Sequence, residues 1–288
     1  MLLEPGYYKD LSAKDYHASH SISSSALVHA LRSPAHFWAN YIGNPKCVAK
    51  QDKPALHFGR AAHVYLLERD TFPLQYAVTP KLDRRTTAGK QLHASFEETC
   101  AENGTEIITE DDLATIKGMA EALEQFEIEE GVSGAVIPLA QVFAKGRAEE
   151  SFVWTDPESG LLLRARTDWR IGNVVVDYKT ARDARPQPFR REVAHRRYYM
   201  RAAMYLDGIE AVTGTRPSAF FLVAQEKEAP YAAAAYQINP DNLEFGRQQY
   251  KAALMSIRRC LDAGRWDGYS RQVQVITVPD YLYEETVQ

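Results

Sequence analysis

The sequence predicts a fold of the α/β class. We expect a mixed sheet, with parallel and antiparallel strands as in α+β proteins, that packs against helices. The stretch RARTDWRIGNVVVDYKT reads as two adjacent strands joined at Gly172-Asn173, because strand-like runs flank a turn pair. Further along, a helical segment at about residues 189–212 leads into the apolar strand segment SAFFLVAQ. Neither an internal repeat nor a low-complexity linker divides the chain, so we expect a single domain over residues 1–288.

The first half of the chain is predicted to be mainly helical. The serine cluster of ISSSALVHALR can cap one helix, and the pair Ser33-Pro34 supplies the cap and first turn of the next. A third helix is expected over residues 54–67, and the loop KLDRRTTAGK leads to a fourth near residues 90–102. Thr109 can cap a long helix whose apolar stripe consists of Leu113, Ile116, Ala120, Leu123 and Phe126.

The second half alternates strands with helices. Three strands are expected at about residues 150–155, 161–169 and 173–180, and the turn DPESG separates the first two. After the helix and strand already described come a strand in YAAAAYQI and a long helix from Asn239-Pro240-Asp241 to about Ala263. The alternating tail RQVQVITV predicts an edge strand. From residue 54 onward the core order is therefore helix, three strands, helix, strand.

Composition predicts a globular protein with a substantial core. The chain has 288 residues, of which 45% are hydrophobic and 25% charged. No apolar run reaches 18 residues, and the start MLLEPGYYKD lacks the pattern of a signal peptide, so we expect a cytoplasmic location. Cys47, Cys100 and Cys260 are scattered and odd in number, which argues against a disulfide framework, a zinc module or a four-cysteine iron–sulfur cluster.

The charge is acidic overall and basic in two places. The net charge of -4 and the pI near 6.1 give no global signature of nucleic-acid binding. The basic residues of the two tracts are Arg182, Arg185, Arg190, Arg191, Arg196, Arg197 and Arg201 in the first, and Lys81, Arg84, Arg85 and Lys90 in the second. Such a protein suits a polyanion that enters a channel, although each tract alone is also consistent with a solvated face.

Three charged residues at the predicted hairpin are the strongest candidates for chemistry. Strand side chains alternate, so Asp177 and Lys179 project to the same side, and Asp168 on the neighbouring strand can join them. Two carboxylates can hold a hard divalent cation, and an ammonium beside them can orient a water, which together equip a site for metal-assisted hydrolysis of a phosphodiester. The alternative is that these residues only mark where the apolar run VVV emerges into solvent.

The order of the elements resembles the core of the PD-(D/E)XK nuclease superfamily. More specifically, ISSSALVHALRSPAHFWANY, FGRAAHVYLLE, TAGK, the stretch from Asp168 to Thr180 and YYMRAAMYLDG are similar to the RecE-type exonucleases of phages and prophages, also called exodeoxyribonuclease VIII. The likeness covers about residues 16–270. It implies a restriction-endonuclease-like core with added N-terminal helices: a helical elaboration at 1–53, the core at 54–226 with a helical insertion at about 81–130, and a strand and helix extension at 227–288.

The resemblance assigns the metal ligands. It implies that His63, Asp168, Asp177 and the backbone carbonyl of Tyr178 hold a magnesium or manganese ion, since both ions accept hard oxygen donors and one imidazole. Lys179 is then expected to contact the attacking water. A lone histidine on a helix such as FGRAAHVYLLE is otherwise more often a hydrogen-bonded core residue.

Two further positions qualify this assignment. Glu149 and Glu150 adjoin on a strand, so only one can face the site, and we expect Glu150 to add a ligand or to support one. In YYMRAAMYLDG the resembled family commonly has a glutamine where this chain has Arg201, on the same helix face as Tyr205. An arginine there can contact a phosphate, but it can also repel a metal ion.

The resemblance also implies contacts with DNA. Free N–H groups and hydroxyls at a helix start form an anion site, so Ser23, Ser24 and Ser25 are expected to receive a terminal phosphate, although helix capping explains the same residues. The other residues expected to contact DNA are Arg84, Arg85, Lys90, Arg201 and Tyr205.

The function that the resemblance implies is a metal-dependent exonuclease. It would degrade the 5′-ended strand of linear double-stranded DNA and leave 3′ single-stranded tails for recombination by strand annealing. The resemblance further implies a homo-oligomeric ring, a trimer or tetramer, that works beside a RecT-like single-strand annealing protein in the cytoplasm of a bacterial host. Two alternatives stay open: a structure-specific or restriction-type endonuclease of the same superfamily, and a DNA-binding or assembly protein without catalysis.

Overall fold

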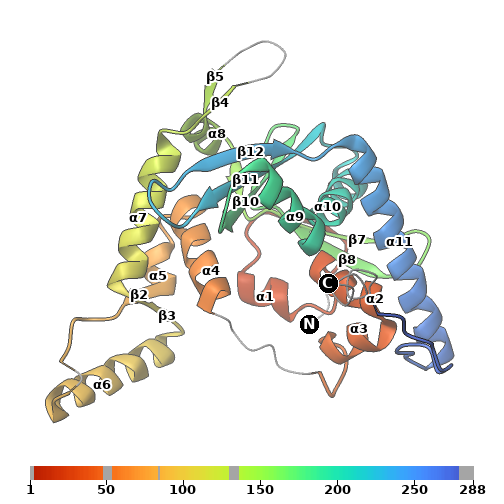
Figure 1. Ribbon diagram of the computed structural model, residues 1–288, viewed down its shortest axis with the longest axis horizontal. Coiled ribbons are helices and arrows are strands. Elements are labelled where there is room, and N and C mark those ends of the chain that lie inside the picture. The colour runs from red at the N-terminus through yellow and green to blue at the C-terminus, as the bar shows by residue number, and fades with distance from the viewer. Residues whose placement is uncertain (1–2, 48–53, 84, 130–135, 279–288) are drawn as a thin grey trace, which may run out of the picture.

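The computed structural model describes residues 3–47, 54–83, 85–129 and 136–278. Strands gather at the centre of the molecule, with α4 (Pro54–Leu67) and α7 (Glu110–Glu124) on one side and α11 (Pro240–Ala263) on the other (Figure 1). This combination of a mixed sheet with flanking helices confirms the predicted α/β class. Among the described helices, none combines the length and the apolar character that crossing a membrane requires.

A five-stranded sheet forms the centre of the fold. Its strands lie in the order β12-β11-β10-β9-β6, and β10 and β11 are its parallel pair. The strand bounds are Arg147–Ala148 for β6, Trp169–Ile171 for β9, Val174–Ala181 for β10, Ala219–Glu226 for β11 and Ala233–Gln237 for β12. The central place of β10 and β11 explains their near-continuous apolar sequences, because both faces of a central strand are covered.

Two helices connect the parallel strands. α9 spans Pro186–Arg196 and α10 spans Tyr198–Thr213, and Arg197 between them has a left-handed backbone with φ of 55°. The single helix expected over this region is therefore two helices, since a left-handed residue interrupts the right-handed spiral. α10 is buried along most of its length, and Gly208 lets it approach the small sheet described next.

A three-stranded antiparallel sheet packs against α10. Its order is β1-β7-β8, with β1 at Gly6–Tyr8, β7 at Ser151–Thr155 and β8 at Leu162–Arg166. The predicted turn DPESG joins β7 to β8. It is fixed by the Asp156 carboxylate, which accepts hydrogen bonds from the N–H and the hydroxyl of Ser159 at 2.8 and 2.7 Å.

The chain passes between the two sheets at two adjacent points, which we call the sheet corner. Glu149 and Glu150 lie between β6 of the large sheet and β7 of the small one, and Thr167 and Asp168 lie between β8 and β9. The crossings are joined by two backbone hydrogen bonds, from the Glu149 N–H to the Asp168 carbonyl at 3.3 Å and from the Thr167 N–H to the Glu150 carbonyl at 3.0 Å. The strand expected over residues 161–169 is thus divided into β8 and β9.

Short N-terminal helices pack beside α11. α2 (Ser24–Arg32) and α3 (Pro34–Asn40) contact it directly, and α1 (Ala13–Ala18) precedes them. Ser23 and Ser33 cap α2 and α3 through their hydroxyls, so both predicted caps are confirmed.

The remaining helices and two small strand pairs lie on the α4 side. The helices are α5 (Phe72–Gln75), α6 (Thr87–Asn103) and α8 (Leu139–Lys145), and the strands are β2 (Tyr76–Val78), β3 (Glu106–Ile108), β4 (Glu127–Glu129) and β5 (Val136–Pro138). α4 packs against β10 and α7, with Ala61 and Ala62 fully buried. Thr109 caps α7 in a capping box with Asp112, and α6 begins slightly earlier than expected because Thr86 caps it.

One predicted strand is wrong. The tail RQVQVITV is exposed throughout and forms no strand in the described part of the chain. Its alternating pattern is typical of a strand, but a strand also needs a neighbour for its backbone hydrogen bonds, and none of the described strands pairs with it.

Candidate metal centre

β10 supplies a buried carboxylate and an ammonium to the candidate site. Asp177 and Lys179 project to the same side, as predicted, and the Lys179 Nζ lies 2.7 Å from the Asp177 Oδ2. Asp177 is only 1% exposed, yet neither of its oxygens accepts a hydrogen bond of normal geometry from the described residues. A buried carboxylate in this condition is a candidate for a functional position, because most buried polar atoms have a hydrogen-bond partner.

Asp168 joins these residues from the sheet corner. Its Oδ2 accepts a hydrogen bond from the Tyr178 N–H at 2.8 Å and lies 3.3 Å from the Lys179 Nζ. The structure therefore brings Asp168, Asp177 and Lys179 together, as the sequence predicts. The Tyr178 carbonyl accepts a hydrogen bond from the same Nζ at 2.9 Å, so it lies beside them as well.

α4 brings His63 to the same place. The helix lies close to the end of β10, where a Cβ on Gly59 would be 3.4 Å from the Thr180 hydroxyl. The His63 Nε2 is 2.9 Å from the Asp168 Oδ2, and its Nδ1 is 3.5 Å from the Glu149 Oε1. Because both ring nitrogens face carboxylates, His63 is more than a core histidine with one hydrogen bond.

The glutamate at the site is Glu149, and the expectation that Glu150 faces the site is wrong. The fully buried Glu150 carboxylate pairs with Arg170, whose Nε lies 2.6 Å from Oε2, and accepts a hydrogen bond from the Tyr7 hydroxyl. Glu149 has a left-handed backbone with φ of 53°, which breaks the strand alternation on which the expectation depended. Alternation does indicate that one of the two faces the site, but it does not indicate which.

The donor set fits a hard divalent cation. His63, Glu149 and Asp168 each offer one ligand atom, and these atoms lie within 4.8 Å of one another. One imidazole nitrogen with carboxylate oxygens suits magnesium or manganese. Asp177 lies next to this group, because Lys179 contacts both Asp168 and Asp177, so its carboxylate can act as a further ligand.

The charges of the site depend strongly on one another. Burial opposes ionisation of Asp168, but Lys179 and His63 outweigh it and hold the Asp168 pKa well below its usual range. Burial and the neighbouring Asp168 raise the Asp177 pKa. Burial also opposes the charge on Lys179, but Asp168 and Asp177 prevail and raise its pKa, so Lys179 is an ammonium here and not a free base.

Two other site residues titrate nearer neutral pH. Burial raises the pKa of Glu149 to about 7, although His63 works in the opposite direction. Burial lowers the pKa of His63, but the charge of Asp168 and its hydrogen bond, helped by Glu149, bring it to about 9. Both groups therefore carry a proton at neutral pH for part or most of the time, and a cation would have to displace that proton to bind them.

Arg201 of α10 also reaches the site. Its Nη1 lies 3.8 Å from the Asp177 Oδ1, and its guanidinium carbon is 5.5 Å from the centre of the Tyr198 ring. Lys179 approaches the same ring at 5.6 Å. The residue that departs from the resembled family therefore lies directly against a predicted metal ligand.

The serine cluster lies beside this arginine. Ser23 caps α2, and its hydroxyl is 3.0 Å from that of Ser25. Ser24 is buried, and its helix α2 contacts α10, which carries Arg201 and, one helical turn later, Tyr205. Burial raises the Tyr205 pKa to about 12, so this hydroxyl keeps its proton as a donor.

The second basic tract is not at the site. Arg85 and Lys90 are exposed at the start of α6, which projects away from the central sheet (Figure 1). Lys81 pairs with Glu110 at 2.5 Å. Arg84 lies outside the described residues. The structure therefore brings together the predicted residues on α2, α4, β10 and α10, but not those around α6.

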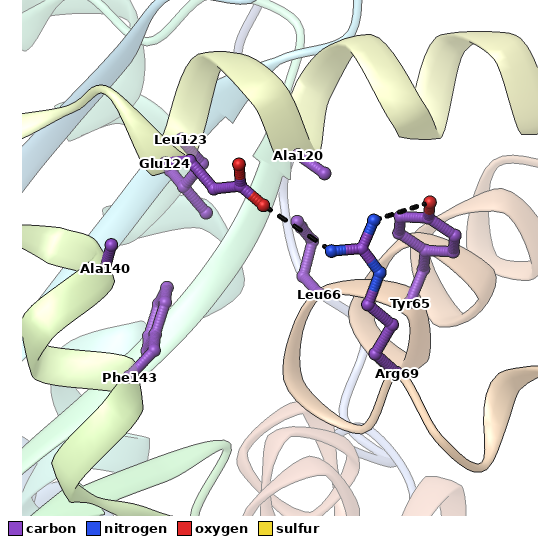
Figure 2. A pocket seen from close by; sticks show the side chains of 8 residues that line it. All are labelled: Tyr65, Leu66, Arg69, Ala120, Leu123, Glu124, Ala140 and Phe143. Carbon is purple, nitrogen blue, oxygen red and sulfur yellow. Dashed lines mark hydrogen bonds and ion pairs between the residues drawn. The ribbon is translucent and has the colours of Figure 1, made fainter.

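A small apolar hollow elsewhere offers no comparable chemistry. It lies between α4, α7 and α8 and has a volume of about 60 Å³ (Figure 2). Arg69 lies across it, 3.5 Å from the Glu124 Oε1 and 3.1 Å from the Tyr65 hydroxyl. None of its lining residues belongs to the site described above.

Comparison with known proteins identifies a family and one protein of similar fold. The model of a family described as "PDDEXK-like domain of unknown function (DUF3799)" matches residues 23–279. A crystal structure of a proposed exonuclease from Eubacterium rectale has a TM-score of 0.58 at 12% identity, over 96% of this chain and 98% of that one. The structure of SSO0001, with a TM-score of 0.32 at 15% identity over 82% and 76% of the two chains, is too distant to compare folds. No curated protein matches the sequence.

Proposed function

This chain belongs to the PDDEXK-like family DUF3799, and from that premise we propose that it is a metal-dependent exonuclease acting on DNA. The observation that carries the proposal is the convergence of His63, Asp168, Asp177 and Lys179 from α4, the sheet corner and β10. This constellation is set in the α/β fold of the PD-(D/E)XK type, which supports phosphodiester hydrolysis over a purely structural role.

The ligands proposed for a magnesium or manganese ion are His63, Asp168, Asp177, Glu149 and the Tyr178 carbonyl. When bound, such an ion polarises a phosphate oxygen and lowers the pKa of a bound water. Lys179 stays protonated between the two aspartates, so its role is to orient the attacking water and to stabilise negative charge on the phosphate. The water attacks phosphorus in line and loses a proton, and the bond to the 3′ oxygen breaks. The 3′ oxygen takes up a proton, so one proton passes overall from the water to the leaving hydroxyl.

A terminal phosphate is proposed to bind at the serine cluster. Ser23 and Ser25 lie at the start of α2, where free N–H groups favour an anion. Arg164, which is buried, donates to the Ser21 carbonyl at 2.7 Å and so holds the segment that leads into α2. α10 contacts α2 and carries Arg201, which lies 3.8 Å from Asp177, so we propose that one strand end reaches both places.

The finer features of the substrate follow from the RecE-type resemblance. It supports degradation of the 5′-ended strand of linear duplex DNA, with 3′ tails as product. A ring of three or four copies, a RecT-like annealing partner and action in a bacterial cytoplasm are proposed on the same basis. The Eubacterium rectale protein, described as a proposed exonuclease, shares the fold and is consistent with this assignment.

Digestion of linear duplex DNA labelled separately at its 5′ and 3′ ends tests the proposal. We expect release of 5′ label that requires magnesium and is lost in Asp177→Ala, while circular dichroism shows that the variant folds. Early release of 3′ label contradicts the polarity. Absence of any metal-dependent release contradicts the nuclease assignment itself.

Two alternatives have distinct outcomes in the same assay. A structure-specific or restriction-type endonuclease shares this site but also cuts closed circular DNA, which an exonuclease leaves intact. The second alternative is a DNA-binding or assembly protein without catalysis. Arg201 suggests it, because its positive charge lies against Asp177 and could repel a metal ion. This alternative predicts DNA binding without cleavage at any metal concentration.

A further inference from the structure

The two oxygens of Asp177 face two different cationic side chains. Oδ2 lies 2.7 Å from the Lys179 Nζ, and Oδ1 lies 3.8 Å from the Arg201 Nη1. The compact ligand group of His63, Glu149 and Asp168 does not include Asp177 among the described residues. Asp177 is thus placed between that ligand group and Arg201.

Tyr198 packs against Arg201, whose side chain stays partly exposed beside Asp177. Its guanidinium carbon packs 5.5 Å from the Tyr198 ring centre, and the side chain is 27% exposed. Within the described residues its guanidinium makes no hydrogen bond, although it carries five N–H groups. A planar fork with free donors beside a proposed metal site is arranged to bind phosphate oxygens.

Arg201 occupies the place that a second cation beside Asp177 would take. Its Nη1 lies 3.8 Å from the Asp177 Oδ1, and its guanidinium packs on the ring of Tyr198, whose hydroxyl keeps its proton because burial raises its pKa. A further cation at Oδ1 of Asp177 would share that oxygen with a guanidinium, and like charges repel at this range. The place is therefore already filled by a positive charge that the protein provides.

We propose that this site takes a single divalent cation and that Arg201 does the work of a second one. In two-metal nucleases, two cations neutralise the charge that develops on the attacking and leaving oxygens. Here the guanidinium next to Asp177 supplies the second of these charges to the phosphate. The inference rests on the proposed function, because it concerns the same site, and it explains why a large cation lies against a metal ligand.

Counting bound manganese in the full-length protein tests the inference without an activity assay. Manganese is titrated into wild type, Arg201→Gln and Arg201→Lys, and the free ion is measured by electron paramagnetic resonance. We expect about one ion per chain in wild type and in Arg201→Lys, and about two in Arg201→Gln, where loss of the charge opens the place beside Asp177. Arg191→Gln, which removes the same charge from an exposed position on α9, is the matched control and keeps the wild-type count.

The position of the added ion gives a second readout. Two manganese ions that share Asp177 produce a spin-coupled signal in Arg201→Gln, whereas an ion bound elsewhere on the surface does not. Two ions in wild type, or one in Arg201→Gln, overturn the role of Arg201 while the proposed metal-dependent function stands. No bound ion in wild type overturns the metal site and the inference together.

Discussion

Glu149 and Asp168 are joined at the sheet corner, where the Glu149 N–H donates to the Asp168 carbonyl at 3.3 Å and both side chains face His63. The two acids are 19 positions apart in the chain and enter the corner from different strands. The backbone bond fixes their spacing before any ligand arrives, so the site is organised by the fold itself.

The two neighbouring glutamates are expected to respond differently to the same substitution. Glu149→Gln removes a charged ligand and lowers manganese affinity by about 10- to 100-fold, by analogy with losses around other metal sites. Glu150→Gln leaves the affinity unchanged, because its partner is Arg170. It instead lowers the free energy of unfolding by about 2 kcal/mol, as expected for a buried charged hydrogen bond. Calorimetric titration and urea unfolding measure the two effects, and equal affinities in both variants would contradict the assignment of Glu149.

Manganese affinity is expected to rise with pH. The ligands bind metal only without their protons, and the pKa values of Glu149 and His63 are about 7 and about 9. Below pH 7 both groups are protonated and must release a proton on binding, whereas above pH 9 neither does. Titration at one pH in buffers of different ionisation enthalpy counts the protons released. At pH 6, the number of protons released on binding should be lower in Glu149→Gln than in wild type. If wild type released no proton at pH 6, Glu149 and His63 would be ruled out as ligands.

Asp177→Asn is expected to stabilise the metal-free protein while it abolishes cleavage. The Asp177 pKa is raised by burial and by Asp168, so the folded state binds this proton more tightly than the unfolded state does. The free energy of unfolding therefore falls as pH rises from the Asp177 pKa of the unfolded state through that of the folded state. Asparagine carries no charge at any of these pH values, so the variant avoids this loss. Thermal unfolding in EDTA at pH 7 should show a higher melting temperature for Asp177→Asn than for wild type. A marked fall would mean that Asp177 stabilises the fold.

The approach of α10 to the small sheet is expected to tolerate no methyl group. A Cβ at Gly208 would lie 2.4 Å from the Trp154 ring, so Gly208→Ala should reduce the free energy of unfolding by about 1–3 kcal/mol. Gly268→Ala is the control, because nothing lies within 4 Å of its Cβ position. Urea unfolding of both variants decides the matter, and equal midpoints would show that the indole can move aside.

Much of the site could be predicted because it depends on local rules. Asp177 and Lys179 are two positions apart on a strand, so they share a face in any sheet. Glu149 could not be identified, because its positive φ and the change of sheet at the corner arise from packing far along the chain. Arg197 likewise gives no signal in the sequence for the break between α9 and α10. In the tail after α11, by contrast, the sequence predicts a strand that the structure does not have. Alternation of residue types makes a strand possible, but it does not supply the neighbouring strand that must pair with it.

The sheet corner has a mechanical consequence. The proposed ligands come from α4, from the crossings between the sheets and from β10. One bound ion would therefore add a direct link from α4 to the sheet corner and β10, which backbone hydrogen bonds already join to each other. Such an ion acts as a removable cross-link, and its loss lets the α4 side open separately from the α10 and α11 side. Bound metal would then make unfolding more cooperative, and resistance to proteases would report how much of the protein is loaded.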